Sequence, residues 1–126
     1  MTKLLLLVED DKFVSAFVET VLDEGGYTVV VAESGKDAMA RLKKAAELDG
    51  LITDIRLGEG PDGWEVARHA RELKPTMAVV YMSGDSASDW AAQGVPKSVM
   101  LQKPFVEAQL LTAISGLLIE NDSSLG

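Results

Sequence analysis

Five short apolar runs, rich in Leu, Val and Ile, recur along the 126-residue chain, and stretches with helical spacing of apolar residues separate them. Strands buried on both faces have such continuous apolar runs, and parallel strands need a crossover segment between them. The alternation therefore predicts an α/β fold, a doubly wound parallel sheet of five strands with five helices. The predicted strands are Lys3–Val8, Tyr27–Ala32, Leu51–Thr53, Ala78–Met82 and Val99–Gln102.

Capping and stop signals place the helices between these runs. Gly25-Gly26 ends the first helix, Ser34 with Asp37 resembles a capping box for the second, and Asp62 can cap a third that continues to Leu73. The segment 87–93 is short and polar, so we expect the fourth helix to be the weakest. The apolar stripes of the first, second and last helices are Phe13, Phe17, Val18, Val21 and Leu22; Ala38, Leu42 and Ala45; and Val106, Leu110, Ile114 and Leu117.

Length and composition indicate one domain, over residues 1–120, followed by a polar tail at 121–126 that we expect to be flexible. The net charge of −8 disfavours nucleic acid as a partner, and the absence of cysteine excludes disulfides and thiolate metal sites. The apolar run Leu4–Val8 is too short for a signal peptide or a membrane span. We therefore expect a cytoplasmic protein that does not bind membranes.

Polar and charged residues follow four of the five predicted strands. In a doubly wound sheet, ligands bind in the crevice outside the carboxyl ends of the strands. Carboxylates gathered there repel one another unless a cation neutralises them, and Mg²⁺, which prefers oxygen ligands and phosphates, is the natural candidate. The groups after the first, third, fourth and fifth strands are Glu9-Asp10-Asp11, Asp54, Ser83-Gly84-Asp85 and Lys103-Pro104.

In this order, and across residues 3–118, these groups resemble the motifs of bacterial response-regulator receiver domains. The resemblance rests on Leu-Leu-Val-Glu-Asp-Asp after the first strand, Asp54 after the third, Ser83-Gly84 after the fourth and Lys103-Pro104-Phe105 after the fifth. It implies a flavodoxin-like fold with strand order 2-1-3-4-5. It also implies a two-component phosphorylation switch rather than a turnover enzyme.

The resemblance assigns Asp54 as the residue that accepts a phosphoryl group from a histidine kinase or a histidine phosphotransfer protein. Ser83 is similar to the switch hydroxyl of these domains and Lys103 to their phosphate clamp. The chemistry is consistent with this assignment, because phosphoryl transfer mainly needs positioning and charge stabilisation. An ionised aspartate is already a nucleophile and needs no general base.

The same resemblance assigns the ligands of Mg²⁺. Asp10 and Asp54 are expected to bind the ion directly, Glu9 through a water molecule, and Arg56 through its backbone carbonyl. A downstream protein partner is expected to bind the face formed by the fourth helix and the fifth strand.

Simpler interpretations exist for each motif alone. The three acids after the first strand could cap a helix, Asp54 and Ser83-Gly84-Asp85 could be turn residues, and Lys103-Pro104 could begin the last helix. Their ordered combination at one sheet edge favours the functional interpretation. The alternatives are a receiver-like interaction module that is never phosphorylated and a haloacid-dehalogenase-type phosphatase, although the latter needs Asp-x-Asp after its first strand. A flavin-binding domain would need a phosphate-cradling loop where the acids stand.

Two features depart from the usual receiver pattern. Met100 replaces the aromatic residue that many receivers carry three positions before the lysine, and the loop 56–63 is one residue longer than usual. We expect Arg56 and Asp85 to form a pair that partly shields the phosphorylated acceptor from water.

Three further residues have simpler interpretations. His69 is expected to be a surface residue and not a phosphodonor, and Trp64 to be a packing residue. Trp90 is expected either to pack or to contact a partner.

Overall fold

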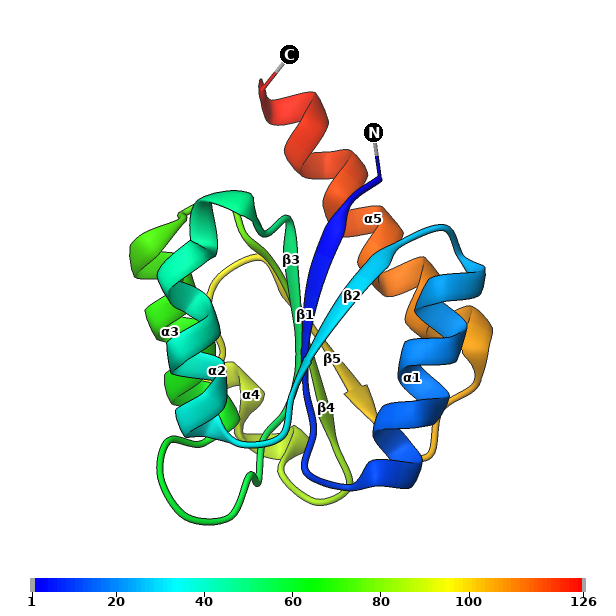
Figure 1. Cartoon of the computed structure of the whole chain (residues 1–126). Helices are drawn as coiled ribbons and strands as arrows, with labels where there is room; N and C mark the ends of the chain where they lie inside the picture. Colours follow the sequence, from blue (N-terminus) through cyan, green and yellow to red (C-terminus); the bar gives the residue numbers. More distant parts are fainter. Residues whose placement is uncertain (1, 126) are drawn as a thin grey trace.

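One parallel sheet with helices on both faces forms the molecule (Figure 1). The structure is a computed structural model that describes residues 2–125. The strand order is β2-β1-β3-β4-β5, so the predicted fold class and strand order are confirmed. The strands are β1 (Leu4–Val8), β2 (Thr28–Ala32), β3 (Gly50–Asp54), β4 (Ala78–Ser83) and β5 (Ser98–Gln102).

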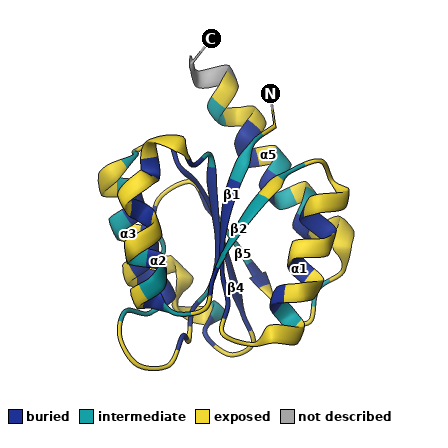
Figure 2. Cartoon of the chain, viewed as in Figure 1, coloured by how far each residue is buried: buried dark blue, intermediate teal, exposed yellow. Residues whose placement is uncertain are grey.

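Side chains of the strands alternate between two apolar cores. The central strands are accordingly buried along most of their length (Figure 2). In β1, Leu5 and Leu7 belong to the core beneath α1 (Lys12–Glu24) and α5 (Glu107–Leu125), while Leu6 and Val8 belong to the opposite core. That second core lies beneath α2 (Gly35–Arg41) and α3 (Gly63–Leu73). The alternation follows from the two-residue period of a strand and explains why the runs are apolar throughout.

The predicted caps and stops are present. Asp11 begins α1 by accepting hydrogen bonds from the N–H groups of Phe13 (2.8 Å) and Val14 (3.2 Å). Ser34 accepts from the N–H of Asp37 and caps α2, and Asp62 accepts from the N–H of Glu65 and caps α3. Gly26, with a φ of 94°, follows the end of α1 in the left-handed region that glycine adopts without strain.

The second predicted helix is only partly α-helical. Its α-helix ends at Arg41, and the 3₁₀ helix η1 (Leu42–Glu47) continues it, with a non-helical backbone at Lys44 (φ −105°, ψ 31°). Leu42 and Ala45 remain buried, so the predicted stripe is correct although the helix type changes. The fourth segment contains the 3₁₀ turn η2 (Ala87–Asp89) and the short α4 (Trp90–Gln93), which confirms the weak fourth helix.

Three residues of the predicted apolar stripes lie outside the core. Phe13 is 90% exposed and Phe17 is 41% exposed, and Val106 precedes α5 and is exposed as well. Helical spacing alone does not separate a core residue from an apolar surface residue one turn further along. The remaining residues of these two stripes are buried: Val18, Val21, Leu22, Leu110, Ile114 and Leu117.

Helix α5 continues to Leu125 and extends beyond the sheet (Figure 1), past the domain end expected at residue 120. The side-chain amide of Asn121 donates to the carbonyl of Thr76, and Lys3 pairs with Asp122 at 3.1 Å. The expected flexibility of 121–126 stays a prediction, and Gly126 lies outside the described residues. Within residues 2–125, no helix is long and apolar enough to cross a membrane.

Candidate functional site

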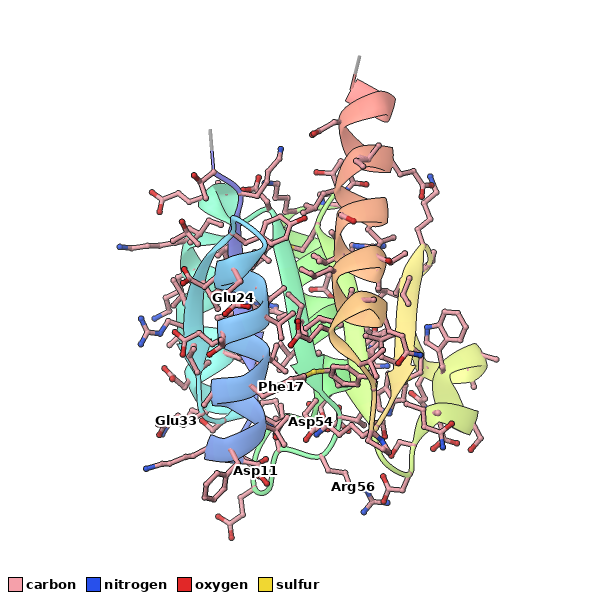
Figure 3. The ribbon with its side chains drawn as sticks, turned by 90° about the vertical axis from the view of Figure 1, so that its right-hand side faces the viewer. Asp11, Phe17, Glu24, Glu33, Asp54 and Arg56 are labelled. Carbon is pink, nitrogen blue, oxygen red and sulfur yellow. The ribbon has the colours of Figure 1, made fainter. Side chains whose placement is uncertain are left out.

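Three carboxyl groups meet at the carboxyl ends of β1 and β3. Glu9 and Asp10 follow β1, and Asp54 ends β3, whose Thr53 is in register with Val8. One carboxylate oxygen from each acid lies within 4.8 Å of the others. Figure 3 shows Asp54 at this end of the sheet, near Asp11 at the start of α1. The structure thus brings together the three predicted carboxylate ligands.

Lys103 joins this acid cluster from the end of β5. Its Nζ lies 2.9 Å from Glu9 Oε2 and 3.2 Å from Asp54 Oδ2. Burial lowers the pKa of Lys103, but its hydrogen bond to Glu9 and the charges of Asp54 and Glu9 outweigh that effect and raise it. Lys103 therefore stays a cation between the two carboxyl groups.

Glu9 is the most buried of the three acids, with 2% of its surface exposed. The pKa of Glu9 is raised to about 7, mainly because the group is buried; the hydrogen bond from Lys103 lowers it and the charge of Asp54 raises it. The site thus holds more negative charge than one lysine compensates. Carboxylate oxygens are the ligands that a hard divalent cation prefers, so this donor set fits Mg²⁺.

The backbone around Asp54 holds its carboxylate in one orientation. The N–H of Ile55 donates to Asp54 Oδ1 at 2.8 Å, which leaves Oδ2 facing Lys103. Gly63, the first residue of α3, donates its N–H to the carbonyl of Ile55, and a Cβ at Gly63 would lie 2.0 Å from the carbonyl oxygen of Asp54. Only glycine allows this close packing. Sequence reasoning missed Gly63, although its place directly after the capping Asp62 is a usable signal.

Ser83 ends β4 and is buried. Its Oγ accepts hydrogen bonds from the N–H groups of Ser86 (2.7 Å) and Asp85 (3.2 Å), and its carbonyl accepts from the N–H of Lys103. Because β3 and β4 are paired, with Asp54 in register with Met82, Ser83 follows directly beside the acceptor strand. The hydroxyl therefore organises the loop after β4 at the edge where Asp54 lies.

The predicted pair between Arg56 and Asp85 is present. Arg56 Nε lies 2.9 Å from Asp85 Oδ2, and Asp85 Oδ1 also accepts from the hydroxyl of Ser86 at 3.0 Å. Arg56 extends from the loop after Asp54 (Figure 3), so the pair connects the loops that follow β3 and β4. The role of the Arg56 carbonyl as a metal ligand stays a prediction.

Other residues singled out in the sequence analysis lie outside the carboxylate cluster. Asp11 caps α1, as the simpler interpretation of the acids proposes, and does not belong to the carboxylate cluster. Pro104 lies before α5 rather than in its first turn, and the Lys103-Pro104 peptide bond is cis. His69 lies on α3 and is partly buried. Trp64 packs against the ring of Tyr81, with centroids 4.8 Å apart, which confirms its packing role.

An apolar groove lies beside the acid cluster, with a volume of about 510 Å³. The rings of Phe17 and Phe105 form part of it, with centroids 6.4 Å apart. Lys103 lies at its margin, so the groove is continuous with the site. Its lining residues are Phe13, Val14, Phe17, Lys103, Pro104 and Phe105.

A carboxylate oriented by a backbone N–H, with two further acids and a lysine around it, is suited to accept a phosphoryl group. Comparison with known protein families agrees with this chemistry, because residues 5–115 match the response regulator receiver domain. The chain belongs to this family. Its fold is thus that of a receiver domain of two-component signalling.

Individual relatives support the same conclusion. This receiver domain is 33% identical to the response regulator receiver protein CpdR of Brucella abortus over 119 residues, 93% of this chain and 98% of CpdR. It is 33% identical to the sensor kinase CckA of Brucella abortus over 122 residues, but that match spans 13% of the kinase. The crystal structure of a receiver protein from Sinorhizobium medicae superposes with a TM-score of 0.92 at 45% identity, covering 95% of this chain and 97% of the other.

Proposed function

We propose that this receiver domain accepts a phosphoryl group on Asp54 in a magnesium-dependent reaction and then presents a changed surface to a protein partner. The observation that carries the proposal is the position of the Asp54 carboxylate. It lies between Lys103 Nζ, 3.2 Å away, and the carboxyl groups of Glu9 and Asp10. Receiver domains are phosphoacceptor switches, so we propose a protein that transfers a signal rather than one that turns over a substrate.

The phosphodonor is a phosphohistidine on a histidine kinase or a histidine phosphotransfer protein. An oxygen of the Asp54 carboxylate attacks phosphorus, a new O–P bond forms, and the N–P bond to the imidazole breaks. The imidazole leaves with the electron pair and takes a proton from solvent. Lys103 donates a hydrogen bond to the transferred group and offsets the charge that gathers on its oxygens.

The acids supply the metal site. Asp10 and Asp54 would hold Mg²⁺ directly, Glu9 would hold it through water, and the Arg56 carbonyl would be the remaining protein ligand. The ion would neutralise charge on the acids and on the phosphoryl oxygens. Without the ion, the negative charge of the three acids opposes the approach of an anionic donor.

The hydrolysis of the product makes the signal temporary. Water attacks phosphorus, the O–P bond to Asp54 breaks, and inorganic phosphate leaves. While the group is present, the hydroxyl of Ser83 donates to it and gives up its bonds with Ser86 and Asp85. The loop after β4 and α4 therefore change position, and the face of α4 and β5 carries the signal to a downstream partner.

The apolar groove is where we propose that the phosphodonor binds. Phe13 is almost fully exposed beside the acceptor, and an isolated surface gains nothing from such a ring. The helices on this side are acidic, so a helical donor segment with apolar residues and basic flanks fits best. The acids of α1 and α5 are Glu19, Asp23, Glu24, Glu107, Glu120 and Asp122, and their only base is Lys12. Since this acidic surface suits protein donors and not nucleic acid, we place the protein in the cytoplasm, with the kinases.

Intact mass spectrometry tests the proposal. The wild-type chain, incubated with acetyl phosphate and Mg²⁺, should gain the mass of one phosphoryl group, and both Asp54→Asn and wild type in EDTA should gain none. Absence of a gain in the wild type would favour an interaction module that is never phosphorylated. Steady release of phosphate from small phosphate esters would favour a phosphatase instead.

A further inference from the structure

The connection between β4 and β5, residues 84–97, has no apolar anchor within its helical part. No residue of η2 or α4 is buried. A helix of four residues is not stable by itself, so side-chain hydrogen bonds must hold this connection in place. These bonds differ between its two ends.

The end near β5 is held from several directions. The buried hydroxyl of Tyr81 accepts a hydrogen bond from the N–H of Val95 at 3.1 Å. Trp90 Nε1 donates to Ser98 Oγ at 2.9 Å, and Ser98 Oγ donates to the carbonyl of Val95 at 2.6 Å. Arg71, on α3, donates to the carbonyls of Pro96 (2.6 Å) and Lys97 (3.1 Å).

The end near β4 depends on the switch site itself. Ser83 Oγ holds the N–H groups of Asp85 and Ser86, and the exposed pair between Arg56 and Asp85 adds a weak contact. Under the proposed function, these bonds are lost when Ser83 moves to donate to a phosphoryl group. The signal would then release this end of the connection, whereas the bonds that hold the other end do not involve Ser83.

Tyr81 lies between these two ends. It is two residues before Ser83 on β4, so both side chains lie on the same face of the sheet. Its ring packs against Trp64, and its strand neighbour on β5 is Met100, the position without an aromatic residue. The hydroxyl bond to Val95 thus links the strand that carries the switch serine to the turn that precedes β5.

We propose that Tyr81 is a positioning residue that fixes the turn 94–98, so that occupancy of the Asp54 site moves residues 84–92 about this turn. Tyr81 places an aromatic ring on β4 beside Met100, the position of β5 that lacks one. The motion of 84–92 rests on the proposed function. The bond that fixes the turn does not, because it exists without any group on Asp54.

Hydrogen exchange of Tyr81→Phe tests the fixed turn. The variant keeps the ring against Trp64 and removes the acceptor of the Val95 N–H. In EDTA, the Val95 amide should exchange about tenfold faster than in the wild type, as expected for the loss of one buried hydrogen bond. The Val80 amide, in the centre of β4, reports global opening and should not change by more than the lowered stability explains. The control Tyr27→Phe should match the wild type, and an unchanged Val95 amide in Tyr81→Phe would overturn the proposal.

The second arm adds Mg²⁺ and beryllofluoride, an analogue of the phosphoryl group. In the wild type, exchange should change at residues 84–92 while 94–98 stays protected, and in Tyr81→Phe the change should extend into 94–98. Equal changes across 84–98 in both proteins would overturn the proposal. If beryllofluoride did not change exchange in the wild type, this would contradict the proposed function. The fixed turn would still be decided by the Val95 amide in EDTA, because that comparison needs no group bound at Asp54.

Discussion

Glu9 shows how single residues set the properties of the site. It combines near-complete burial with a hydrogen bond from Lys103 and a neighbouring charge on Asp54. Because burial raises the pKa of Glu9 to about 7 from its ordinary 4.5, the folded chain holds the Glu9 proton to a higher pH than the unfolded chain does. The contribution of Glu9 to the free energy of unfolding is therefore present at low pH and is lost as the pH rises through its raised pKa.

Glu9→Gln should remove this pH dependence. In EDTA, the free energy of unfolding of the wild type should fall by roughly 1 to 3 kcal/mol, relative to the variant, between about pH 5 and about pH 8. The reason is that glutamine cannot ionise beside Asp54. Urea denaturation at both pH values measures the difference. If the free energy of unfolding changed equally with pH in the two proteins, this would contradict the raised pKa of Glu9.

The pair between Arg56 and Asp85 should slow the loss of the phosphoryl group. Arg56→Ala and Asp85→Ala should each shorten the lifetime of the acyl phosphate by up to about fivefold, the range expected for an exposed ion pair worth at most about 1 kcal/mol. Phosphate release after removal of excess donor measures this lifetime. Glu59→Ala, an exposed change in the same loop, is the control. Lifetimes equal to that control would show that the pair does not shield the acceptor.

At the scale of elements, the residues that meet at the strand ends could be predicted from the sequence, but the exposure of single side chains could not. The acids, Ser83 and Lys103 follow apolar strands, and parallel pairing brings the ends of these strands together, so their proximity could be predicted. Phe13 and Tyr81 show the limit. Phe13 has the spacing of a core residue but is exposed, and the hydroxyl of Tyr81 contacts Val95 through packing that no local pattern encodes.

The exposed ring on α1 gives a test of the donor surface. The donor is a purified histidine kinase that phosphorylates the wild type. Phe13→Ala should lower kcat/KM for transfer from this kinase about tenfold and should leave phosphorylation by acetyl phosphate unchanged. Since Phe13 is exposed, the fold should keep its stability. Leu73→Ala, an exposed apolar change on α3, is the matched control. Equal loss with both donors would place the defect at the acceptor instead of the docking surface.

At the scale of the whole molecule, the two helical layers differ in charge. The layer with α1 and α5 is acidic, whereas the layer with α2, η1 and α3 carries six basic residues, Lys36, Arg41, Lys43, Lys44, Arg68 and Arg71. The acid cluster lies at the sheet edge between these layers. The sheet order that places it there was predicted, while the change from α2 to η1 was not, because it depends on the local backbone at Lys44.

Cation binding should stabilise the whole fold through this cluster. Mg²⁺ at ten times its Kd should add about 1.4 kcal/mol to the free energy of unfolding of the wild type. Asp10→Asn should show little gain, and it should be more stable than the wild type in EDTA because one repelling charge is gone. Thermal melts across a Mg²⁺ titration measure both effects. An equal gain in the variant would mean that the ion binds elsewhere.

The central claim, that Asp54 is the residue that carries the phosphoryl group, can be tested by locating the acyl phosphate. Borohydride reduces an aspartyl phosphate to homoserine, which peptide mass spectrometry assigns to a position in the chain. After incubation with acetyl phosphate and Mg²⁺, we expect homoserine at position 54 and no reduced acid elsewhere in the chain. Homoserine at position 10, the hydroxynorvaline that a glutamyl phosphate at position 9 would give, or no reduced acid at all would contradict it.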